Sequence, residues 1–553
     1  MKLTGAEVMV QCLTEQGVDT VFGYPGGTIL PFYDAMNNSS LRHILTVHEQ
    51  GAAHAADGYA RASGKVGVCI ATSGPGATNL VTGLAAAFMD SIPVVAITGQ
   101  VPTTMIGRDT FQEIDITGIT MAITKHNFIV KDVTKLADTI RYAFRIAASG
   151  RSGPVLIDVP RDIQTSVVDF EPLAEFEKYS WAVGGEILSK IKTAVQAIQG
   201  AARPVIVVGG GAVAADAADE IRALAEKINA PVVSTLMGLG SFSGTHPLFL
   251  GLTGMHGCKV ANQAVWEADV MIAVGSRFSD RLTGDRDKYV EDKTVIHIDI
   301  DPAEIDKNVA AHIGLTGDLK IIVDLLNGQL NDGQRSKWWM RIRECQQDEA
   351  VDGDEKQLSP SWVFSHIAEE TFGKECIFVT DVGQHQMWAA QNLKIEKPRT
   401  WITSGGLGAM GFGLPAAMGA QFAKPDKRVI HFAGDGGFKM TGAELYTIAA
   451  HKLPVISVII NNHGLGMIRQ LQHVFFDNNY TSCELPPNVD FTVFAAAFGV
   501  HAVAVNSAVE FVQAFKQALA SNQPAVIVVN ISREELVTPM AHPSGAINAF
   551  IDM

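Results

Sequence analysis

The chain has 553 residues, of which 47% are hydrophobic, and its formal net charge at pH 7 is −15. A length well beyond about 250 to 300 residues excludes a single hydrophobic core and predicts about three domains. The negative charge would be repelled by nucleic-acid phosphates and by anionic membranes, which argues against both kinds of partner.

The beginning of the chain and its apolar runs favour a soluble protein. The segment MKLTGAEVMVQCL lacks the basic region, the apolar run and the cleavage site of a secretory signal. Elsewhere Gly, Pro or charged residues interrupt every apolar stretch before about 18 residues, the length that a membrane-spanning helix needs. We therefore expect a cytoplasmic protein.

Patterns typical of strands alternate with patterns typical of helices along the chain, which predicts parallel α/β sheets. Two polar stretches, residues 166–188 and 327–360, interrupt this alternation, and we interpret them as connectors. The predicted domains are then residues 1–165, 189–327 and 360–535, followed by a C-terminal tail at 536–553.

The first and third predicted domains share a sequence repeat. A shift of 361 positions aligns residues 51–99 with residues 412–460 without a gap, so that Gly58 matches Gly419 and IPVV matches LPVI. Small-residue helices and apolar strands can produce such agreement by chance, but the ungapped length favours two copies of one α/β unit. The two domains are therefore expected to resemble each other.

The middle domain begins with a pattern that suggests a nucleotide cofactor. RPVIVVGGGAVAADAADEIRALAEK, at residues 203–227, predicts a strand, a glycine turn and a helix. This order invites a dinucleotide-binding interpretation. Because Gly209, Gly210 and Gly211 do not complete the G-x-G-x-x-G pattern, the segment by itself is weak support for a cofactor.

In the third domain, two neighbouring predicted strands end in polar residues. HFAGDGGF places Asp435 between two glycines after one apolar strand, and Asn461 and Asn462 follow the next. Parallel sheets bind ligands at the carboxyl ends of their strands, and carboxylate and amide oxygens with phosphates suit Mg²⁺. Helix N-termini there would complement the phosphate charge. The motif therefore predicts a metal-bound diphosphate; the alternative is two ordinary turns, for which Asp, Asn and Gly are also typical.

Gly-Asp-Gly, followed one helix and one strand later by Asn-Asn, resembles the fingerprint of thiamine diphosphate enzymes. The resemblance covers nearly the whole chain. It implies the fold of that family, with three doubly wound parallel-sheet α/β domains. The first domain would bind the pyrimidine of the cofactor, and the third its diphosphate and Mg²⁺.

Eight further segments follow one another in a specific order: FGYPGG (22–27), HEQGAAHAADGYAR (48–61), TSGPGATNL (72–80), GQVPTTMIGRDTFQEID (99–115), TGMHG (253–257), VGSRFSDRLTGD (274–285), TDVGQHQMW (380–388) and SGGLGAMGFGLPAA (404–417). Together they are similar to the catalytic subunits of acetolactate synthases, also called acetohydroxyacid synthases. This resemblance implies that pyruvate is decarboxylated on thiamine diphosphate and that the two-carbon unit is transferred to a second 2-keto acid. That acceptor is pyruvate or 2-ketobutyrate, and the reaction opens branched-chain amino-acid biosynthesis.

Three other functions compete with this one. A pyruvate oxidase would share thiamine diphosphate and FAD but would pass electrons through the flavin. A glyoxylate-type carboligase carries an apolar residue where this chain has Glu49. A regulatory or scaffold protein without catalysis is expected to have lost Glu49, Asp435 or Asn462, which are all present.

Glu49 is the first catalytic candidate. Without the resemblance, it would be an acid favourably placed near the N-terminus of a helix. The resemblance implies that its carboxyl group binds the aminopyrimidine ring and selects the tautomer that removes the thiazolium C2 proton. Met410 matches the bulky residue that folds the two cofactor rings together, and the carbonyl of Gly408 would face the amino group. A core methionine is the alternative for Met410.

The resemblance also implies the other contacts with thiamine diphosphate and its metal. Mg²⁺ would be bound by Asp435, Asn462 and the backbone oxygen of Gly464. The remaining cofactor contacts would be Pro25, Val382, Gly383, Gln384, His385, Gly436, Gly437 and Met467.

FAD is expected in the middle domain, bound mainly for structural reasons because acetolactate synthesis transfers no net electrons. The residues that match FAD-binding segments of the family are Arg151, Gly209, Gly210, Gly211, Thr235, Leu236, Met237, His256, Gly275, Arg277, Asp299, Ile300 and Asp318.

Arg277 also matches the arginine that binds the carboxylate of the acceptor substrate, for which a planar guanidinium is suited. Phe111, Gln112 and Lys125 match positions that line the same pocket. The segment Gln470-Leu471-Gln472 departs from the family, in which most biosynthetic members have tryptophan in place of Leu471. That difference leaves the preference between pyruvate and 2-ketobutyrate open.

The family places each active site between the first domain of one subunit and the third domain of another. The resemblance therefore implies a homodimer or a homotetramer. A small regulatory subunit is common among the relatives, but nothing in the sequence decides whether this chain binds one.

Overall fold

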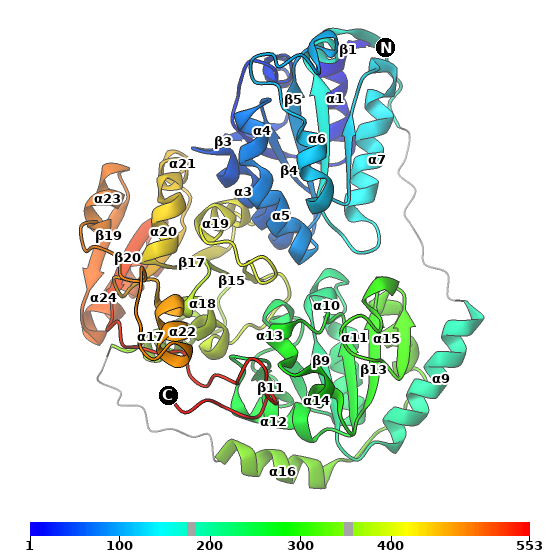
Figure 1. The fold of residues 1–553 in the computed structure, drawn as a ribbon, viewed down its shortest axis with the longest axis vertical. Coiled ribbons are helices and arrows are strands. Elements are labelled where there is room, and N and C mark those ends of the chain that lie inside the picture. Colours follow the sequence, from blue (N-terminus) through cyan, green and yellow to red (C-terminus); the bar gives the residue numbers. More distant parts are fainter. Residues whose placement is uncertain (174–183, 348–357) are drawn as a thin grey trace.

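The computed structural model describes residues 1–173, 184–347 and 358–553. Three parallel sheets, each of six strands with helices packed on both faces, occupy separate parts of the molecule (Figure 1). A two-stranded antiparallel sheet accompanies the first. The expected α/β class is confirmed.

The first sheet is formed by residues near the N-terminus. Its region contains β1 (Lys2–Thr4), α1 (Gly5–Glu15), β2 (Thr20–Gly23), α2 (Leu30–Met36), β3 (Arg42–Leu45), α3 (Glu49–Ser63), β4 (Gly67–Ala71), α4 (Pro75–Asn79), α5 (Val81–Asp90), β5 (Val94–Gln100), η1 (Thr103–Met105), α6 (Ile116–Thr120), η2 (Met121–Ile123), β6 (His126–Ile129), η3 (Val133–Lys135), α7 (Leu136–Ala148), β7 (Val155–Pro160), α8 (Arg161–Thr165) and β8 (Val167–Asp169). The order of its strands is β3-β2-β4-β5-β7-β6, and β1 pairs with β8 outside this sheet.

The middle sheet has the strand order β11-β10-β9-β12-β13-β14. The helices and strands of this region follow here in chain order. They are α9 (Gly185–Gly200), β9 (Pro204–Val208), α10 (Gly210–Ala214), α11 (Ala218–Ile228), β10 (Val232–Ser234), η4 (Leu236–Gly238), β11 (Phe249–Leu252), α12 (Lys259–Glu267), β12 (Val270–Val274), α13 (Asp280–Thr283), α14 (Arg286–Val290), β13 (Thr294–Asp299), η5 (Pro302–Glu304), β14 (Ile313–Thr316), α15 (Leu319–Asn327) and α16 (Ser336–Gln347).

The third sheet has the strand order β16-β15-β17-β18-β20-β19. The helices and strands of this region follow here in chain order. They are α17 (Pro360–Thr371), β15 (Cys376–Thr380), α18 (Gln384–Asn392), β16 (Trp401–Ile402), α19 (Gly413–Ala423), β17 (Arg428–Gly434), α20 (Asp435–Thr441), η6 (Gly442–Glu444), α21 (Leu445–Ala450), β18 (Ile456–Asn461), α22 (Gly466–Phe475), α23 (Phe491–Ala497), β19 (His501–Val505), α24 (Ala508–Ala520) and β20 (Ala525–Asn530).

Each sheet has a position where the chain changes direction across the sheet. These positions lie between β2 and β4, between β9 and β12, and between β15 and β17. In open parallel sheets, the crevice outside the carboxyl ends of such strands is the usual ligand site. The fold therefore directs attention to residues that follow these six strands.

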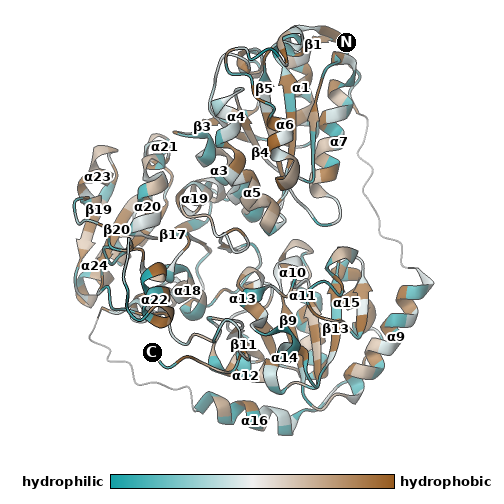
Figure 2. Cartoon of the chain, viewed as in Figure 1, coloured by the Kyte–Doolittle hydropathy of each residue, from teal (hydrophilic) through white to brown (hydrophobic). Residues whose placement is uncertain are grey.

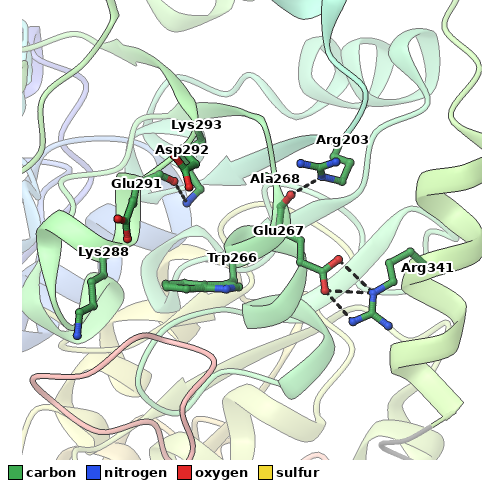
Figure 3. A pocket seen from close by; sticks show the side chains of 9 residues that line it. All are labelled: Arg203, Trp266, Glu267, Ala268, Lys288, Glu291, Asp292, Lys293 and Arg341. Atoms are coloured by element: carbon green, nitrogen blue, oxygen red, sulfur yellow. Dashed lines mark hydrogen bonds and ion pairs between the residues drawn. The ribbon is translucent and has the colours of Figure 1, made fainter.

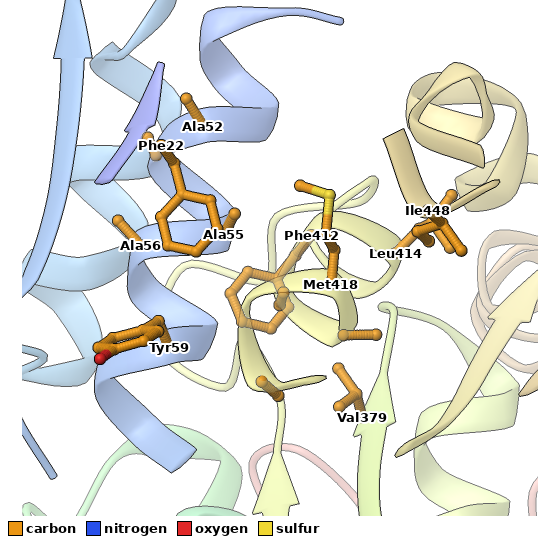
Figure 4. Close-up of a cluster of buried hydrophobic side chains, with 14 of the residues drawn as sticks. Phe22, Ala52, Ala55, Ala56, Tyr59, Val379, Phe412, Leu414, Met418 and Ile448 are labelled. Carbon is orange, nitrogen blue, oxygen red and sulfur yellow. The ribbon is translucent and has the colours of Figure 1, made fainter. Parts of the chain in front are cut away.

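The predicted repeat is present in the fold. The first and third sheets have the same topology, and β4 and β5 occupy the same positions as β17 and β18. The repeat also relates α3 to α19, which pack directly on each other around Phe412 and Met418 (Figure 4). A Cβ atom on Gly58 would lie 2.1 Å from the carbonyl oxygen of Ala416, so the two helices touch at their backbones.

Strand burial follows the sequence pattern. The strands next to the switch positions are buried along nearly their whole length, as expected when helices cover both faces of a parallel sheet. Hydrophobic residues accordingly gather on the strands and on inward helix faces (Figure 2). Within the described residues, no helix combines the length and the apolarity of a membrane span.

The predicted connectors hold more structure than the sequence indicated. The strand β8 lies in the first, and α16 lies in the second and buries Trp338 and Ile342 against the middle sheet region. Residues 174–183 and 348–357 of these connectors lie outside the described residues. The tail after β20 returns to the middle domain, where the Ala541 amide donates to the Met255 carbonyl at 2.7 Å.

Candidate active site

Glu49 begins α3 and lies where β3 gives way to this helix. Its side chain is largely buried, with 9% of the residue exposed. The amide of Asn79, at the end of α4, donates to one carboxylate oxygen at 2.9 Å. A Cβ atom on Gly76 would lie 3.2 Å from the other carboxylate oxygen, so glycine at position 76 leaves room for that oxygen.

A second buried acid, Glu444 from the third domain, holds the turn that precedes Glu49. Its carboxylate accepts hydrogen bonds from the backbone amides of Val47 at 3.1 Å and His48 at 3.3 Å. Burial raises the pKa of Glu444 to about 7, and the Val47 amide opposes that rise. Gly51 makes the contact possible, because a Cβ atom there would lie 2.1 Å from the Glu444 carboxylate.

The expected metal ligands follow β17 and β18. Asp435 is the first residue of α20 and is 2% exposed, and Asn462 follows β18 and is 7% exposed. Among the described residues, Oδ1 of Asp435 is buried without a hydrogen-bond partner. Burial raises the pKa of Asp435 to about 6, with the Lys439 ammonium acting in the opposite direction.

These oxygens fit a hard cation. A Cβ atom on Gly464 would lie 3.9 Å from Oδ1 of Asn462, so the expected backbone ligand and the amide oxygen are neighbours. An unpaired buried carboxylate oxygen is costly unless a ligand compensates it. The described residues contain no cluster of three or more His, Cys, Asp or Glu side chains able to hold a metal. A site made of one carboxylate, one amide and one carbonyl matches Mg²⁺, which takes its other ligands from water and phosphate.

The expected diphosphate residues follow β15, on the other side of the same switch position. Gly383 precedes α18 with φ 150°, and Gln384 and His385 form the first turn of that helix. Burial lowers the pKa of His385 to about 4, which favours a neutral ring. Val382 is half-buried beside these residues, and a Cβ atom on Gly434 would lie 3.2 Å from Nδ1 of His385.

The segment around Met410 approaches the same edge. A Cβ atom on Gly436 would lie 3.5 Å from Cε of Met410. Gly408 has φ 68°, a left-handed conformation that favours glycine. Gly437 packs against Asp381, whereas Met467 is partly buried against the core on the other face of the third sheet.

The expected FAD residues gather at the switch position of the middle sheet. Gly209 and Gly211 follow β9, and each packs against Gly275, which follows β12 with φ 61°. The three glycines thus have a packing role that the sequence did not reveal: a Cβ atom on Gly209 would lie 2.1 Å from the Gly275 carbonyl. Gly210 packs against Met237 of η4, which is preceded by Thr235 and begins with Leu236.

The remaining FAD candidates differ in burial and in the groups that they contact. Asp299 ends β13, and burial raises its pKa to about 6. Ile300 follows it, whereas Asp318 caps α15 by accepting a hydrogen bond from the Ile321 amide. His256 is half-buried, and burial lowers its pKa to about 4. Arg151 forms an ion pair with Glu304 at 2.6 Å.

The expected substrate residues do not form one cluster of contacts in the single chain. Phe111 is 87% exposed, and the neighbouring Gln112 has φ 61°. The ammonium of Lys125 donates to the carbonyls of Ile146 and Ser149 at the end of α7, which is a helix-capping arrangement.

The other two substrate candidates come from different domains. Arg277 donates to the Met89 carbonyl of the first domain at 2.5 Å, and burial lowers its pKa. Leu471 is half-buried on α22, and Pro25 is exposed after β2.

Comparisons with known proteins cover each of the three sheets. The N-terminal thiamine pyrophosphate (TPP) binding domain of thiamine pyrophosphate enzymes matches residues 3–119, the central domain matches 191–326, and the C-terminal TPP binding domain matches 381–529. A probable acetolactate synthase large subunit from Methanocaldococcus jannaschii is 46% identical over 99% of this chain and 95% of that protein. The chain belongs to the acetolactate synthase large-subunit family.

Other relatives in this family agree. The acetolactate synthase isozyme 2 large subunit of Escherichia coli is 44% identical, and the alignment covers 99% of both proteins. An acetolactate synthase large subunit from Parasynechococcus marenigrum is 45% identical over 99% of this chain and 90% of that protein. The edges of the first and third sheets described above therefore belong to the two domains that match TPP binding domains.

Sequence reasoning missed two acids that support the family's site. Glu444 lies nine positions after Asp435, but nothing in the local sequence shows that it reaches the first domain. Asp381 accepts hydrogen bonds from the amides of Val382, Gly411 and Gly413, and burial raises its pKa to about 6. It thereby joins the segments that hold Val382 and Met410.

A surface pocket of about 460 Å³ lies away from these residues, on the middle domain (Figure 3). Several of its charged side chains already have partners: Arg341 binds Glu267 at 2.7 Å, and the Lys293 ammonium donates to two backbone carbonyls. None of the expected site residues lines this pocket. We therefore do not assign the active site to it.

Proposed function

We propose that this protein is an acetolactate synthase, which decarboxylates pyruvate and transfers the two-carbon unit to a second 2-keto acid. The observation that supports this most strongly is the placement of Glu49, Asp435 and Asn462 in domains that bind thiamine diphosphate. Relatives of nearly equal length are named acetolactate synthase large subunits. The proposed domains are residues 1–165, 189–327 and 360–535, with the tail at 536–553.

In the proposed site, Asp435, Asn462 and the carbonyl of Gly464 hold Mg²⁺. Val382, Gly383, Gln384 and His385 would lie along the diphosphate together with Gly436 and Gly437. Thiamine diphosphate, when bound, supplies the carbon nucleophile that attacks the keto group and accepts the electrons released with CO₂. The N-termini of α18 and α20 favour the negative charge of the phosphates.

Glu49 is the proposed proton-handling group. Its carboxylate is buried and is oriented by Asn79, while Glu444 fixes the turn from which it projects. A carboxyl group held in this way can bind the aminopyrimidine ring in one orientation and exchange a proton with it, since geometry precedes acidity in such transfers. Met410 and the Gly408 carbonyl would set the position of that ring.

We propose FAD as a structural cofactor of the middle domain. Gly209, Gly211 and Gly275 bring the segments after β9 and β12 into close backbone contact at the switch position of the sheet, where ligands usually bind. Arg151 and Arg277 lie between the first and middle domains, where Arg151 pairs with Glu304 and Arg277 donates to the Met89 carbonyl. Because the proposed reaction transfers no net electrons, the flavin is expected to stay oxidised during turnover.

The acceptor site is proposed to involve Arg277, with Phe111, Gln112, Lys125 and Leu471 around it. Leu471 is smaller than the tryptophan expected in most biosynthetic relatives and would widen the pocket, so we propose pyruvate as the main acceptor and 2-ketobutyrate as the one to compare. The exposed Phe111 side chain supports a pocket that a second copy of the chain completes.

The proposed assembly is therefore a homodimer or homotetramer in the cytoplasm. Several relatives are named large subunits, which favours a small regulatory subunit as a further partner. Size-exclusion chromatography with light scattering tests the assembly, because a monomeric active enzyme would contradict sites shared between copies.

The function is tested with purified protein supplied with pyruvate, Mg²⁺, thiamine diphosphate and FAD. Acetolactate is measured together with flavin absorbance. Acetolactate with an oxidised flavin supports the synthase, and a competition with 2-ketobutyrate then measures the acceptor preference. A bleached flavin without acetolactate would replace the proposal with a pyruvate oxidase.

A further inference from the structure

Three buried side-chain amides connect the proposed metal site to the C-terminal tail. They belong to Asn462, Gln384 and Gln470, which are 7%, 4% and 0% exposed. Gln470 lies on α22, and its hydrogen bonds reach Val537, at the beginning of the tail. The inference drawn from this chain of contacts rests on the proposed Mg²⁺ site.

The orientation of the Gln470 amide is fixed by backbone groups. The Val537 amide donates to Oε1 of Gln470 at 2.9 Å, and Nε2 of Gln470 donates to the Val537 carbonyl at 3.0 Å. A backbone N–H can only donate and a carbonyl can only accept. A flipped Gln470 amide would therefore lose both bonds at once.

The fixed orientation of the Gln470 amide also fixes the orientation of the Gln384 amide. Its Nε2 donates to Oε1 of Gln470 at 3.0 Å and to the Glu535 carbonyl at 2.9 Å. Both partners are acceptors, so the amide nitrogen must lie on that side and Oε1 must face the opposite way. There it accepts a hydrogen bond from Nδ2 of Asn462 at 3.2 Å.

The consequence for Asn462 is that its nitrogen is turned toward Gln384 and its oxygen away from it. Oδ1 then faces the region of Gly464 that is proposed to hold the cation. Gly466 leaves the space that this contact needs. A Cβ atom on Gly466 would lie 2.0 Å from Oε1 of Gln384 and 2.5 Å from Nδ2 of Asn462, so only glycine leaves space for the two amides to meet.

We propose that Gln470 is a positioning residue for the metal site. Held by the backbone of Val537, it orients Gln384 and, through Gln384, turns the oxygen of Asn462 toward Mg²⁺. The tail thus contributes to metal affinity although it supplies no metal ligand. Residues around a metal site that orient its ligands commonly change affinity strongly when they are replaced.

Gln472 provides a matched control on the same helix. Its amide also pairs with both backbone groups of a single residue: Nε2 donates to the Thr481 carbonyl at 2.9 Å, and Oε1 accepts from the Thr481 amide at 3.3 Å. It makes no contact with Gln384 or Asn462 among the interactions of the described residues. Gln472→Ala therefore removes a similar pair of bonds without breaking the proposed connection.

The experiment measures binding of Mn²⁺, as a paramagnetic substitute for Mg²⁺, to full-length protein with thiamine diphosphate. Free Mn²⁺ is followed by electron paramagnetic resonance. We expect Gln470→Ala to weaken Mn²⁺ binding by about tenfold or more, whereas Gln472→Ala binds like the unmodified protein. A truncation after Leu536 removes the Val537 anchor and should weaken binding by a similar factor. Combining the two changes should add little, because both break one connection.

The outcomes separate this inference from the proposed function. If the unmodified protein does not bind Mn²⁺ with thiamine diphosphate, or if Asp435→Asn binds it as tightly, the metal site itself is overturned. If the site binds Mn²⁺ but Gln470→Ala binds equally well, or loses no more than Gln472→Ala, the role of Gln470 is overturned. Should Gln470→Ala fail to fold by circular dichroism, the truncation decides: unchanged Mn²⁺ affinity would overturn the inference.

Discussion

At the scale of single residues, Glu49 combines burial with a defined orientation. It is 9% exposed and accepts a hydrogen bond from Asn79. Glu49→Gln preserves the size of the side chain but cannot exchange a proton as a carboxyl group does. We expect turnover to fall by about 10² to 10⁴-fold, with cofactor binding largely retained.

The measurement compares kcat with the concentration of thiamine diphosphate that gives half-maximal activity. Gln50→Ala, one position further along the same helix, serves as a control for general damage to α3. Unchanged turnover in Glu49→Gln would remove Glu49 from the proposed proton transfer.

The placement of residues at the ends of strands could be predicted from the sequence, whereas contacts between segments far apart in the chain could not. Asp435 and Asn462 were found because each directly follows a strand of one sheet, and the structure places both at that edge. Glu444 was missed because its partners, Val47 and His48, are almost 400 positions away. The contacts of Lys125 with the end of α7 were likewise not predictable, because they join segments about 20 positions apart; its substrate contact stays a prediction.

At the scale of elements, the contact between η6 and the turn before α3 can be tested by steric compensation. Glu444→Ala removes the carboxylate, and Gly51→Ala adds a methyl group 2.1 Å from its position. Each change alone should lower thermal stability and turnover, because the turn before Glu49 is displaced. In the double variant the carboxylate of Glu444 is gone and leaves space for the methyl group. The combined loss of stability and turnover should therefore be smaller than the sum of the two single losses.

Thermal unfolding and kcat of the four proteins complete this double-mutant cycle. Asp490→Ala, which removes a carboxylate cap from α23 elsewhere in the same domain, measures the cost of losing a helix cap alone. Losses that simply add would show that Glu444 and Gly51 do not act on each other.

The pairing of β5 with β7 contains a pH-dependent contact. Asp158 is 1% exposed, accepts hydrogen bonds from Thr98 and Gln100, and has its pKa raised by burial to about 7. Between about pH 4 and pH 7 the unfolded chain ionises this group while the folded chain keeps it protonated. The stability that it contributes is therefore complete below the ordinary aspartate pKa and is lost as the pH rises toward 7.

Asp158→Asn should remove this dependence, because an amide does not ionise. We expect the midpoint of thermal unfolding to fall more steeply from about pH 5 to pH 7 in the unmodified protein than in the variant. The difference corresponds to about 1.4 kcal/mol for each pH unit of the window. Parallel profiles would mean that Asp158 does not carry the predicted proton.

At the scale of the whole molecule, the first and third domains are joined where the two copies of the repeat meet. The sequence predicted the repeat but not that its two helices would face each other. Gly58 and Ala416 touch on one side, and the equivalent Gly419 and Ala55 touch on the other. Because a shift of 361 positions converts one contact into the other, the two helices pack with approximate twofold symmetry.

This arrangement makes Gly58 and Gly419 sensitive to a single added methyl group. In Gly58→Ala the new Cβ atom would lie 2.1 Å from the Ala416 carbonyl oxygen, and in Gly419→Ala it would lie 1.9 Å from that of Ala55. Neither neighbour is a flexible side-chain end, so the helices must separate. We expect each variant to lose about 1 to 3 kcal/mol of stability, measured by urea and thermal unfolding.

Gly200→Ala is the matched control, since Gly200 ends α9 and a Cβ atom there has no neighbour within 4 Å. It should be neutral or slightly stabilising, because alanine favours a helix. Once one substitution has separated the helices, the second finds more room, so the double variant should lose less than the sum of the single losses. If either glycine behaves like Gly200, the domains are not held together by direct backbone contact between α3 and α19.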